Sequence, residues 1–268
     1  MRNIKMGRKM TALVVLALAG AMLCPAAAKA DAVEQPYLSL GADLNKEEKA
    51  TVLRLLGVDE AKMDQYMVVE ITNADEHEYL DDYMNASVIG SRALSSVLIE
   101  KTEKGSGIEV TTKNITYCTE GMYENALTTA GITDADVTVA GPFNITGTAA
   151  LVGAMNAYED MTGENITEES KDAATNELVI TSDLASALDD PDKAEQFLAL
   201  VKEEVLSQDV SSVEDITAVV DDCARKIQIE LTEEQKAQIA QLMEKISQLD
   251  LDVNTLKEQA ADIYGHVR

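Results

Sequence analysis

Hydrophobic and polar positions alternate along the chain in two different ways, and the change comes near residue 146. Before that point, runs with the two-residue period of strands are interspersed with runs of helical period. After it, every strong apolar stripe has helical spacing. The sequence therefore predicts an α/β domain over residues 31–146 and a helical domain over residues 147–268.

The α/β part is predicted to open with a helix and to continue in the order β-α-β-β-α-β. Asn45 and Glu48 have the spacing of a capping box, and Gly57 follows two leucines, so the first helix is expected between them. The later elements are expected as strands at 66–72, 93–103, 108–117 and 136–140 and as helices at 73–84, capped by Asn73 with Glu76, and 120–130.

The link Lys104-Gly105-Ser106-Gly107 joins two of these strands and is typical of a hairpin. The resulting order is that of the ferredoxin-like, or split βαβ, topology, in which an antiparallel sheet carries both helices on one face. The predicted class is α+β, with this N-terminal part followed by an all-α helical bundle.

Helix starts follow one another throughout the second part. They are marked by Thr148, Thr167, Asp190-Pro191, Ser212 with Asp215, and Thr232 with Gln235. The segment from Thr167 to Leu188 is expected to break near Thr181-Ser182-Asp183, and a last stripe falls on Val253, Leu256, Ala260 and Ile263.

The first thirty residues have the pattern of a secretory signal peptide. Basic residues precede the apolar run from Thr11 to Leu23, and Ala28-Lys29-Ala30 offers small residues for cleavage, so the mature chain is expected to begin at about Asp31. The run is shorter than the roughly 20 residues that span a bilayer. Lipidation of Cys24 is disfavoured because the bulky Leu23 precedes it. The predicted localisation is outside the cytoplasm, either secreted or in the cell envelope.

The chain is strongly acidic, with 48 Asp and Glu against 22 Lys and Arg and a net charge of −26. Removal of the signal peptide takes away basic residues only and makes the charge more negative. Such a field repels nucleic acid and anionic lipid and favours cations or basic partners. We therefore expect no nucleic-acid partner and no membrane span in the mature chain, with an envelope or extracellular protein, or cations, as candidate partners.

Two cysteines remain in the predicted mature chain, Cys118 and Cys223. A disulfide between them is a candidate, because an exported chain permits one. Cys223 lies on an apolar helical stripe, and the alternative interpretation is a small buried hydrophobic residue.

The best candidate site is the passage from Gly141 to Thr148, which leaves a strand and enters a helix. The first turn of a helix presents free N–H groups, so Asn144, Thr146, Gly147 and Thr148 are the candidate ligand-binding residues for a carboxylate or phosphate. The alternative is an ordinary N-cap with a glycine that lets the chain turn.

The sequence offers few residues for nucleophilic catalysis or metal binding. The chain has two histidines, His77 and His266, which leaves little for a histidine-activated nucleophile or a zinc site, and we predict no metal site and no cofactor. The stretch from Asp250 to Asn254 begins like an EF-hand loop, but Thr255 replaces the turn glycine. A catalytic pair of carboxylates, of the kind that glycosidases use, remains an alternative because acidic residues are abundant.

Three phrases in the middle of the chain resemble a known family. They are GIEVTTKNITYCT from Gly107, MYENALTTAGITDADVTVAGPF from Met122 and TGTAALVGAMNAYEDMTG from Thr146. They are similar to the YpuA-like secreted proteins of Gram-positive bacteria, classed as domain of unknown function 1002. The resemblance implies an exported or envelope-associated protein and brings no catalytic residue with it.

These observations favour a non-enzymatic binding or structural module of the envelope or extracellular space. One alternative is a hydrolase that uses carboxylates or the hydroxyls of Thr146 and Thr148. A second is an acidic protein that responds to cations.

Overall fold

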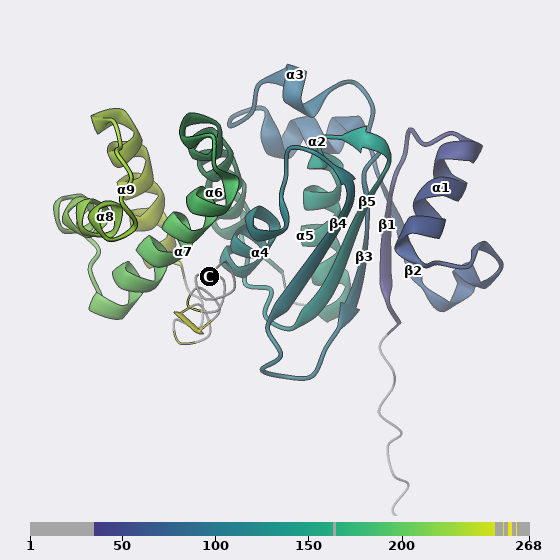
Figure 1. Ribbon diagram of the computed structural model, residues 1–268. Helices are drawn as coiled ribbons and strands as arrows, with labels where there is room; N and C mark the ends of the chain where they lie inside the picture. The colour runs from purple at the N-terminus through teal and green to yellow at the C-terminus, as the bar shows by residue number, and fades with distance from the viewer. Residues whose placement is uncertain (1–34, 163–164, 250–253, 255–256, 259–260, 262–268) are drawn as a thin grey trace, which may run out of the picture. The chain divides into compact units, whose positions relative to one another are not determined.

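A five-stranded mixed sheet forms the centre of the α/β part (Figure 1). The computed structural model describes residues 35–162 and 165–249, together with residues 254, 257, 258 and 261. The strands are β1 (Tyr37–Gly41), β2 (Met67–Ile71), β3 (Ser96–Lys101), β4 (Ile108–Ile115) and β5 (Ala135–Ile145), arranged in the order β2-β1-β3-β5-β4.

The sheet is built from two parallel pairs that flank one antiparallel strand. β1 pairs in parallel with β2, and β4 pairs in parallel with β5. The central β3 runs antiparallel to both β1 and β5. Each parallel pair is joined by a crossover that contains a helix, α1 (Lys46–Leu56) in the first and α4 (Glu120–Thr129) in the second.

The α+β class is confirmed, but the split βαβ strand order and the hairpin are wrong. β3 and β4 are not neighbours, because β5 lies between them and pairs with both. Asp134 explains why the link after β3 spans a strand: its Oδ1 accepts from the backbone N–H groups of Gly105 (2.7 Å) and Gly107 (3.2 Å). These bonds attach the link to the residue before β5, while the Ser106 N–H donates to the Glu103 carbonyl (3.0 Å) in a turn within the link.

The sequence analysis also missed β1. All five of its residues are buried, so it lacks the apolar and polar alternation that identifies a half-exposed strand. Leu38 and Leu40 pack with Val52 and Leu53 of α1, whereas Tyr37 belongs to the larger core beneath the sheet. Burying both faces of the strand gives a run that periodicity alone does not distinguish from loop or helix.

The predicted helix boundaries are largely confirmed. Asn45 and Glu48 form the capping box of α1, and Gly57 ends it in the left-handed conformation. The other helices are α2 (Asn73–Leu80), α3 (Ala86–Ile89), α5 (Thr148–Thr162), α6 (Glu168–Leu188), α7 (Pro191–Gln208), α8 (Val213–Ile227) and α9 (Glu233–Ser247). A short 3-10 helix covers Glu60–Gln65.

Two details of the helices differ from expectation. α6 runs unbroken through Thr181, whose hydroxyl donates to the Glu177 carbonyl 2.7 Å away and so is satisfied within the helix. The cap of α2 is Thr72 with Asp75, one residue earlier than expected, which leaves Asn73 and Glu76 inside the helix. The predicted last stripe, Val253 to Ile263, lies outside the described residues.

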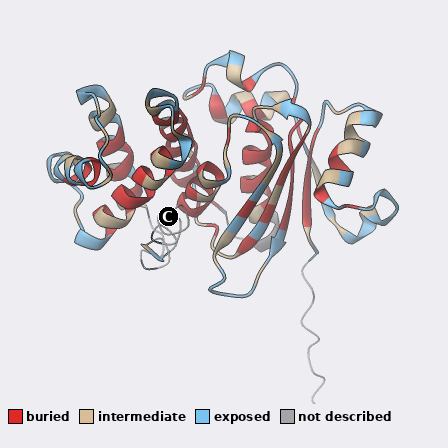
Figure 2. Cartoon of the chain, viewed as in Figure 1, coloured by how far each residue is buried: buried red, intermediate tan, exposed pale blue. Residues whose placement is uncertain are grey.

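One hydrophobic cluster runs from the sheet into the helices. It joins Tyr37 of β1 and Val139 of β5 to α4, α5 and α6 and reaches Ile246 of α9 (Figure 2). α5, which begins next to the predicted boundary at residue 146, packs on β1, β2 and β3. The division at 146 stays a prediction. In the part of the chain that the structure describes, no helix is long and apolar enough to cross a membrane.

Candidate functional site

The predicted loop lies where β5 ends and α5 begins. Asn144 is an exposed residue of β5, Thr146 is half-buried, and Thr148 is the first residue of α5 and 2% exposed. Thr146 and Thr148 are brought together, with their hydroxyl oxygens 3.5 Å apart.

Gly147 is required at this turn. Its φ is +105°, and a Cβ atom there would lie 2.6 Å from the Tyr123 hydroxyl oxygen and 2.8 Å from Cγ2 of Ile115. The Tyr123 hydroxyl donates to the Gly147 carbonyl at 2.6 Å, so the buried α4 holds the turn from below. The geometry of the loop is therefore set by tertiary contacts.

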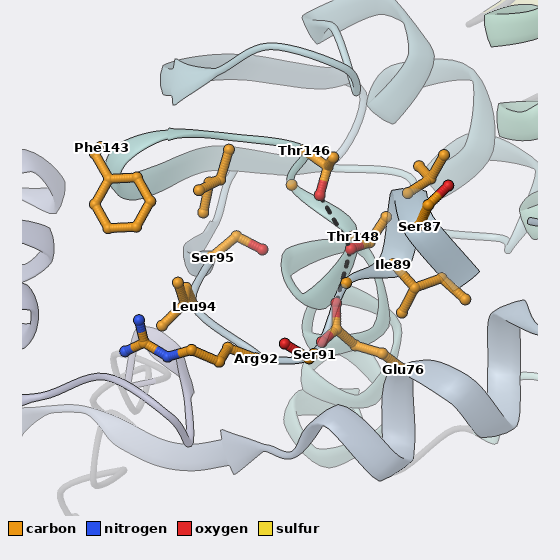
Figure 3. A pocket seen from close by; sticks show the side chains of 14 residues that line it. Glu76, Ser87, Ile89, Ser91, Arg92, Leu94, Ser95, Phe143, Thr146 and Thr148 are labelled. Carbon is orange, nitrogen blue, oxygen red and sulfur yellow. Dashed lines mark hydrogen bonds between the residues drawn. The ribbon is translucent and has the colours of Figure 1, made fainter. Parts of the chain in front are cut away.

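A cavity of about 320 Å³ opens beside this loop (Figure 3). We call it the β3–β5 cavity. It is lined by Ile145 and Thr146 at the end of β5 and by residues of the chain from Ser87 to Ser95. Glu76 and Thr148 also line it and lie close together (Figure 3). The ring of Phe143, which is 50% exposed, also lines it.

The cavity exists because the chain entering β3 leaves the path of β5. Pairing between the two strands stops at Ser96 with Ala140. Just before, Ala93 exchanges two hydrogen bonds with Asp43: its N–H donates to Oδ2 (2.8 Å) and its carbonyl accepts from the Asp43 N–H (3.1 Å). These bonds hold the segment before β3 next to the end of β1. Beyond Ala140, β5 therefore continues without a paired strand on the side of β3.

Glu76 is the carboxyl group of this cavity, and it is 1% exposed. Its Oε1 accepts from the Thr148 hydroxyl at 2.7 Å, and its Oε2 accepts from the Asn73 amide at 3.2 Å. Burial raises the pKa of Glu76 above its ordinary value, and the two hydrogen bonds oppose that shift. Ser95 completes the helix start by accepting from the Ala150 N–H at 2.9 Å.

Arg92 is the basic residue that lines the cavity, and its guanidinium is already engaged. It donates to both carboxylate oxygens of Glu48 (2.6 and 3.2 Å) and to the Asp43 carbonyl (2.8 Å). The hydrogen bonds that Arg92 donates to Glu48 raise the pKa of Arg92. The chain itself thus supplies a carboxylate to the Thr148 hydroxyl and another to Arg92, which disfavours an anionic ligand in this cavity.

The sequence analysis missed Glu76 as a site residue. Its spacing from Asn73 was interpreted as a capping box, whereas Thr72 and Asp75 fill that role. A signal was present in the sequence, because Thr72 also precedes an acidic residue by three positions. If the cap is placed at Thr72 with Asp75, Glu76 lies within the helix and has no capping function.

The two cysteines are free and buried, so the candidate disulfide is not formed. Cys118 lies just before α4 beneath Gly147, and Cys223 lies on the core face of α8. Burial raises the pKa of each thiol to about 12, which makes both poor nucleophiles.

His77 pairs with Asp81 and does not line the β3–β5 cavity. Its Nδ1 lies 2.6 Å from Oδ1 of Asp81, which raises the pKa of the imidazole. His266 lies outside the described residues. Within the described part of the chain, no three His, Cys, Asp or Glu side chains are grouped so that they could hold a metal ion.

The fold and the cavity define an α+β protein with a mixed sheet, a following series of helices and a small pocket at the start of α5. The family model described as "Protein of unknown function (DUF1002)" matches residues 40–263. The chain is also 40% identical over 240 residues to "Uncharacterized protein YpuA" of Bacillus subtilis (strain 168), covering 89% of this chain and 81% of that protein. The chain therefore belongs to the DUF1002 family. No solved structure matches it.

Proposed function

We propose that this protein is an exported, non-enzymatic binding module of the cell envelope and that the β3–β5 cavity is its ligand site. Export is supported by the signal-peptide pattern of residues 1–30. The observation that carries the binding role is the cavity itself, where apolar walls and a few convergent polar groups meet.

The walls favour a neutral, hydroxylated ligand. Ile89, Leu94 and the half-exposed Phe143 ring supply apolar surface, and the hydroxyl groups of Ser91 and Thr146 supply hydrogen bonds. An anion would meet Glu76 and an Arg92 that is already neutralised by Glu48. Ligand pockets range from about 300 to 1,000 Å³, so the cavity suits a small molecule or one ring of a larger one.

The binding role is tested by titrating the purified mature chain with soluble saccharide fragments of the cell wall while backbone amide resonances are recorded. Saturable shifts of Thr146, Gly147 and Thr148 are expected. Phe143→Ala should weaken binding about tenfold, because it removes an aromatic contact with the ligand worth about 1.4 kcal/mol. Val213→Ala is the matched control, since Val213 is an exposed apolar residue on α8.

Two results would contradict the proposal. One is the absence of any saturable shift at the loop across the saccharide set. The other is equal binding by the wild type and Phe143→Ala. Export is checked separately by sequencing the N-terminus of the protein recovered from culture medium and envelope fractions, where a start at about Asp31 is expected.

A hydrolase is the second candidate function, and one contact favours it. The Thr148 hydroxyl donates to Glu76 Oε1 at 2.7 Å, which is the arrangement of a nucleophile and its general base. Turnover of ester or glycosidic substrates that is lost in Thr148→Val and Glu76→Gln but kept in Thr146→Val would support it. Turnover that survives both changes would rule out this pair as its source.

A further inference from the structure

A second cavity, of about 310 Å³, lies between α6 and the region of α2. We call it the α2–α6 cavity. Five carboxylates line it, Glu78 and Asp82 on one side and Glu168, Glu169 and Asp172 on the other. Tyr79 and Tyr83 line the same cavity, so negative charge and aromatic faces are combined there.

A lysine ammonium group lies over each of these tyrosine rings. The Nζ of Lys171 lies 5.5 Å from the centroid of Tyr79, and the Nζ of Lys245, which reaches across from α9, lies 5.9 Å from the centroid of Tyr83. Both separations are in the range of a cation–π interaction. Lys171 itself lines the cavity, and Lys245 reaches the Tyr83 ring from outside the lining, so an ammonium group already fits against each of the two rings.

The two lysines are held to very different degrees. The Lys171 side chain is 8% exposed, and its Nζ lies 3.1 Å from Oε2 of Glu159. The Lys245 side chain is 46% exposed and pairs with the half-exposed Asp172, with 3.0 Å between Nζ and Oδ2. Lys171 is part of the packed structure, whereas Lys245 is a ligand-like group that can leave the Tyr83 ring at low cost.

One observation favours an organic cation over a metal ion, and a second shows that a polar contact is missing at the cavity. The carboxylates of the described residues do not gather into any group that could chelate a metal. Thr175, which lines the cavity and is 1% exposed, has a hydroxyl with no hydrogen-bond partner in the described part of the chain. A buried donor and acceptor left unsatisfied is uncommon and indicates a missing polar contact.

We propose that the α2–α6 cavity binds an alkylammonium group, a primary amine on a flexible methylene stem, over the Tyr83 ring and against Asp172. Lys245 occupies that position in the absence of a ligand and is displaced by it. The chemistry is that of a lysine side chain on a peptide or of a polyamine. This site is separate from the β3–β5 cavity and does not depend on the function proposed for it.

The experiment uses the full mature chain, two probes and calorimetry at physiological salt. Spermidine and trilysine represent the polyamine and the peptide source, and the tighter probe identifies which one the cavity prefers. Lys245→Met should strengthen binding of that probe about fivefold, because it vacates a cation–π position. The ligand methylene protons next to the amine should shift upfield in the NMR spectrum as they pass over the tyrosine ring.

Lys226→Met is the matched control. It removes the same single charge from a comparable lysine on α8, which is 52% exposed and pairs with Glu204. Strengthening in Lys245→Met that is absent in Lys226→Met, and that is lost again on adding Asp172→Asn, supports the site. Equal strengthening in both lysine variants would show attraction by the acidic surface alone and overturn the proposal. Failure of both probes to bind Lys245→Met would overturn it as well.

Discussion

Two of the buried carboxylates differ in the charge of their partners: Glu76 is hydrogen-bonded by neutral groups, whereas Glu177, which also accepts from the Thr129 hydroxyl, pairs with an ammonium group. Glu76, beside the β3–β5 cavity, accepts from the hydroxyl of Thr148. Glu177 of α6 is fully buried and lies 2.7 Å from the ammonium of Lys202 on α7, which is fully buried too. A hydroxyl partner lets a carboxyl become neutral without stranding a charge, whereas an ammonium partner does not.

Both centres join segments that are far apart in the sequence. Lys202 also donates to the Asn125 carbonyl (3.1 Å) and to the Thr129 hydroxyl (2.9 Å) of α4, so α4, α6 and α7 meet at one ammonium group. Burial raises the pKa of Glu177 and lowers that of Lys202. We therefore expect the helical centre to depend on its pairing and the sheet centre to tolerate a change of charge.

The largest expected effect is that of Lys202→Met. It leaves a buried carboxylate without its cation, which costs about 3–5 kcal/mol of unfolding free energy. Urea denaturation of the purified protein measures it. The double variant Lys202→Met, Glu177→Leu should recover much of the loss, because it replaces both charges with apolar groups. If the double variant is no more stable than Lys202→Met, the pairing is not what the centre depends on.

A smaller effect is expected from pH, through Glu195. This residue of α7 is buried, and its carboxylate accepts from the hydroxyl of Thr119, so it resembles Glu76 in its kind of partner. Burial raises its pKa to about 7, from an ordinary value of 4.5. Between these values the folded protein holds a proton that the unfolded chain releases, so the contribution to stability is full below pH 4.5 and is lost as the pH rises through 7.

Glu195→Gln should therefore reduce the loss of stability between pH 5 and pH 8 by about 1–3 kcal/mol. Unfolding free energies at several pH values, compared between wild type and variant, measure the difference. Glu124, which has a pKa raised to about 7 by burial, keeps part of the dependence in the variant. Parallel pH profiles for the two proteins would contradict the assignment to Glu195.

At the sheet centre, Thr148→Val is expected to cost about 1–3 kcal/mol, because the buried Glu76 loses a donor. Glu76→Gln should cost less, since an amide oxygen still accepts from Thr148 and carries no charge. Thermal and urea unfolding of the two variants, with Thr146→Val as the control, test the order. A reversed order, with Glu76→Gln the more damaging, would mean that the charge of Glu76 is itself stabilising.

The smallest effect belongs to an ion pair at the surface. Lys226→Met removes the partner of Glu204 on the solvent side of α7 and α8, and we expect about 0–1 kcal/mol in urea unfolding. The comparison with Lys202→Met isolates burial as the cause of the difference, because both variants delete one lysine from one pair. A loss as large as that of Lys202→Met would contradict this interpretation.

Local signals predicted the helices well. Asn45 with Glu48, Ser212 with Asp215 and Thr232 with Gln235 cap α1, α8 and α9 as their spacing indicates. Asp190 caps α7 with Pro191 in its first turn. A cap is satisfied by atoms within three or four residues, so the information needed to find it is present in the sequence around it.

The sheet shows the opposite case. The residues of β3 and β4 were found, but their neighbour is β5, which follows both of them in the sequence. Which strands become neighbours depends on how the whole chain packs, and no local sequence pattern records it. The same holds for Glu76, whose role depends on a threonine 72 positions away.

The sequence by itself determined the α+β class, most helix ends, the acidic field and the family, because each is written in composition or in short-range spacing. The tertiary structure alone decided the order of the strands, the opening between β3 and β5, and the contacts of Glu76, Glu177 and Lys245. These features join residues that are distant along the chain, so no short-range pattern records them. For Glu76 and Glu177 the contacts matter because packing removes both carboxylates from water.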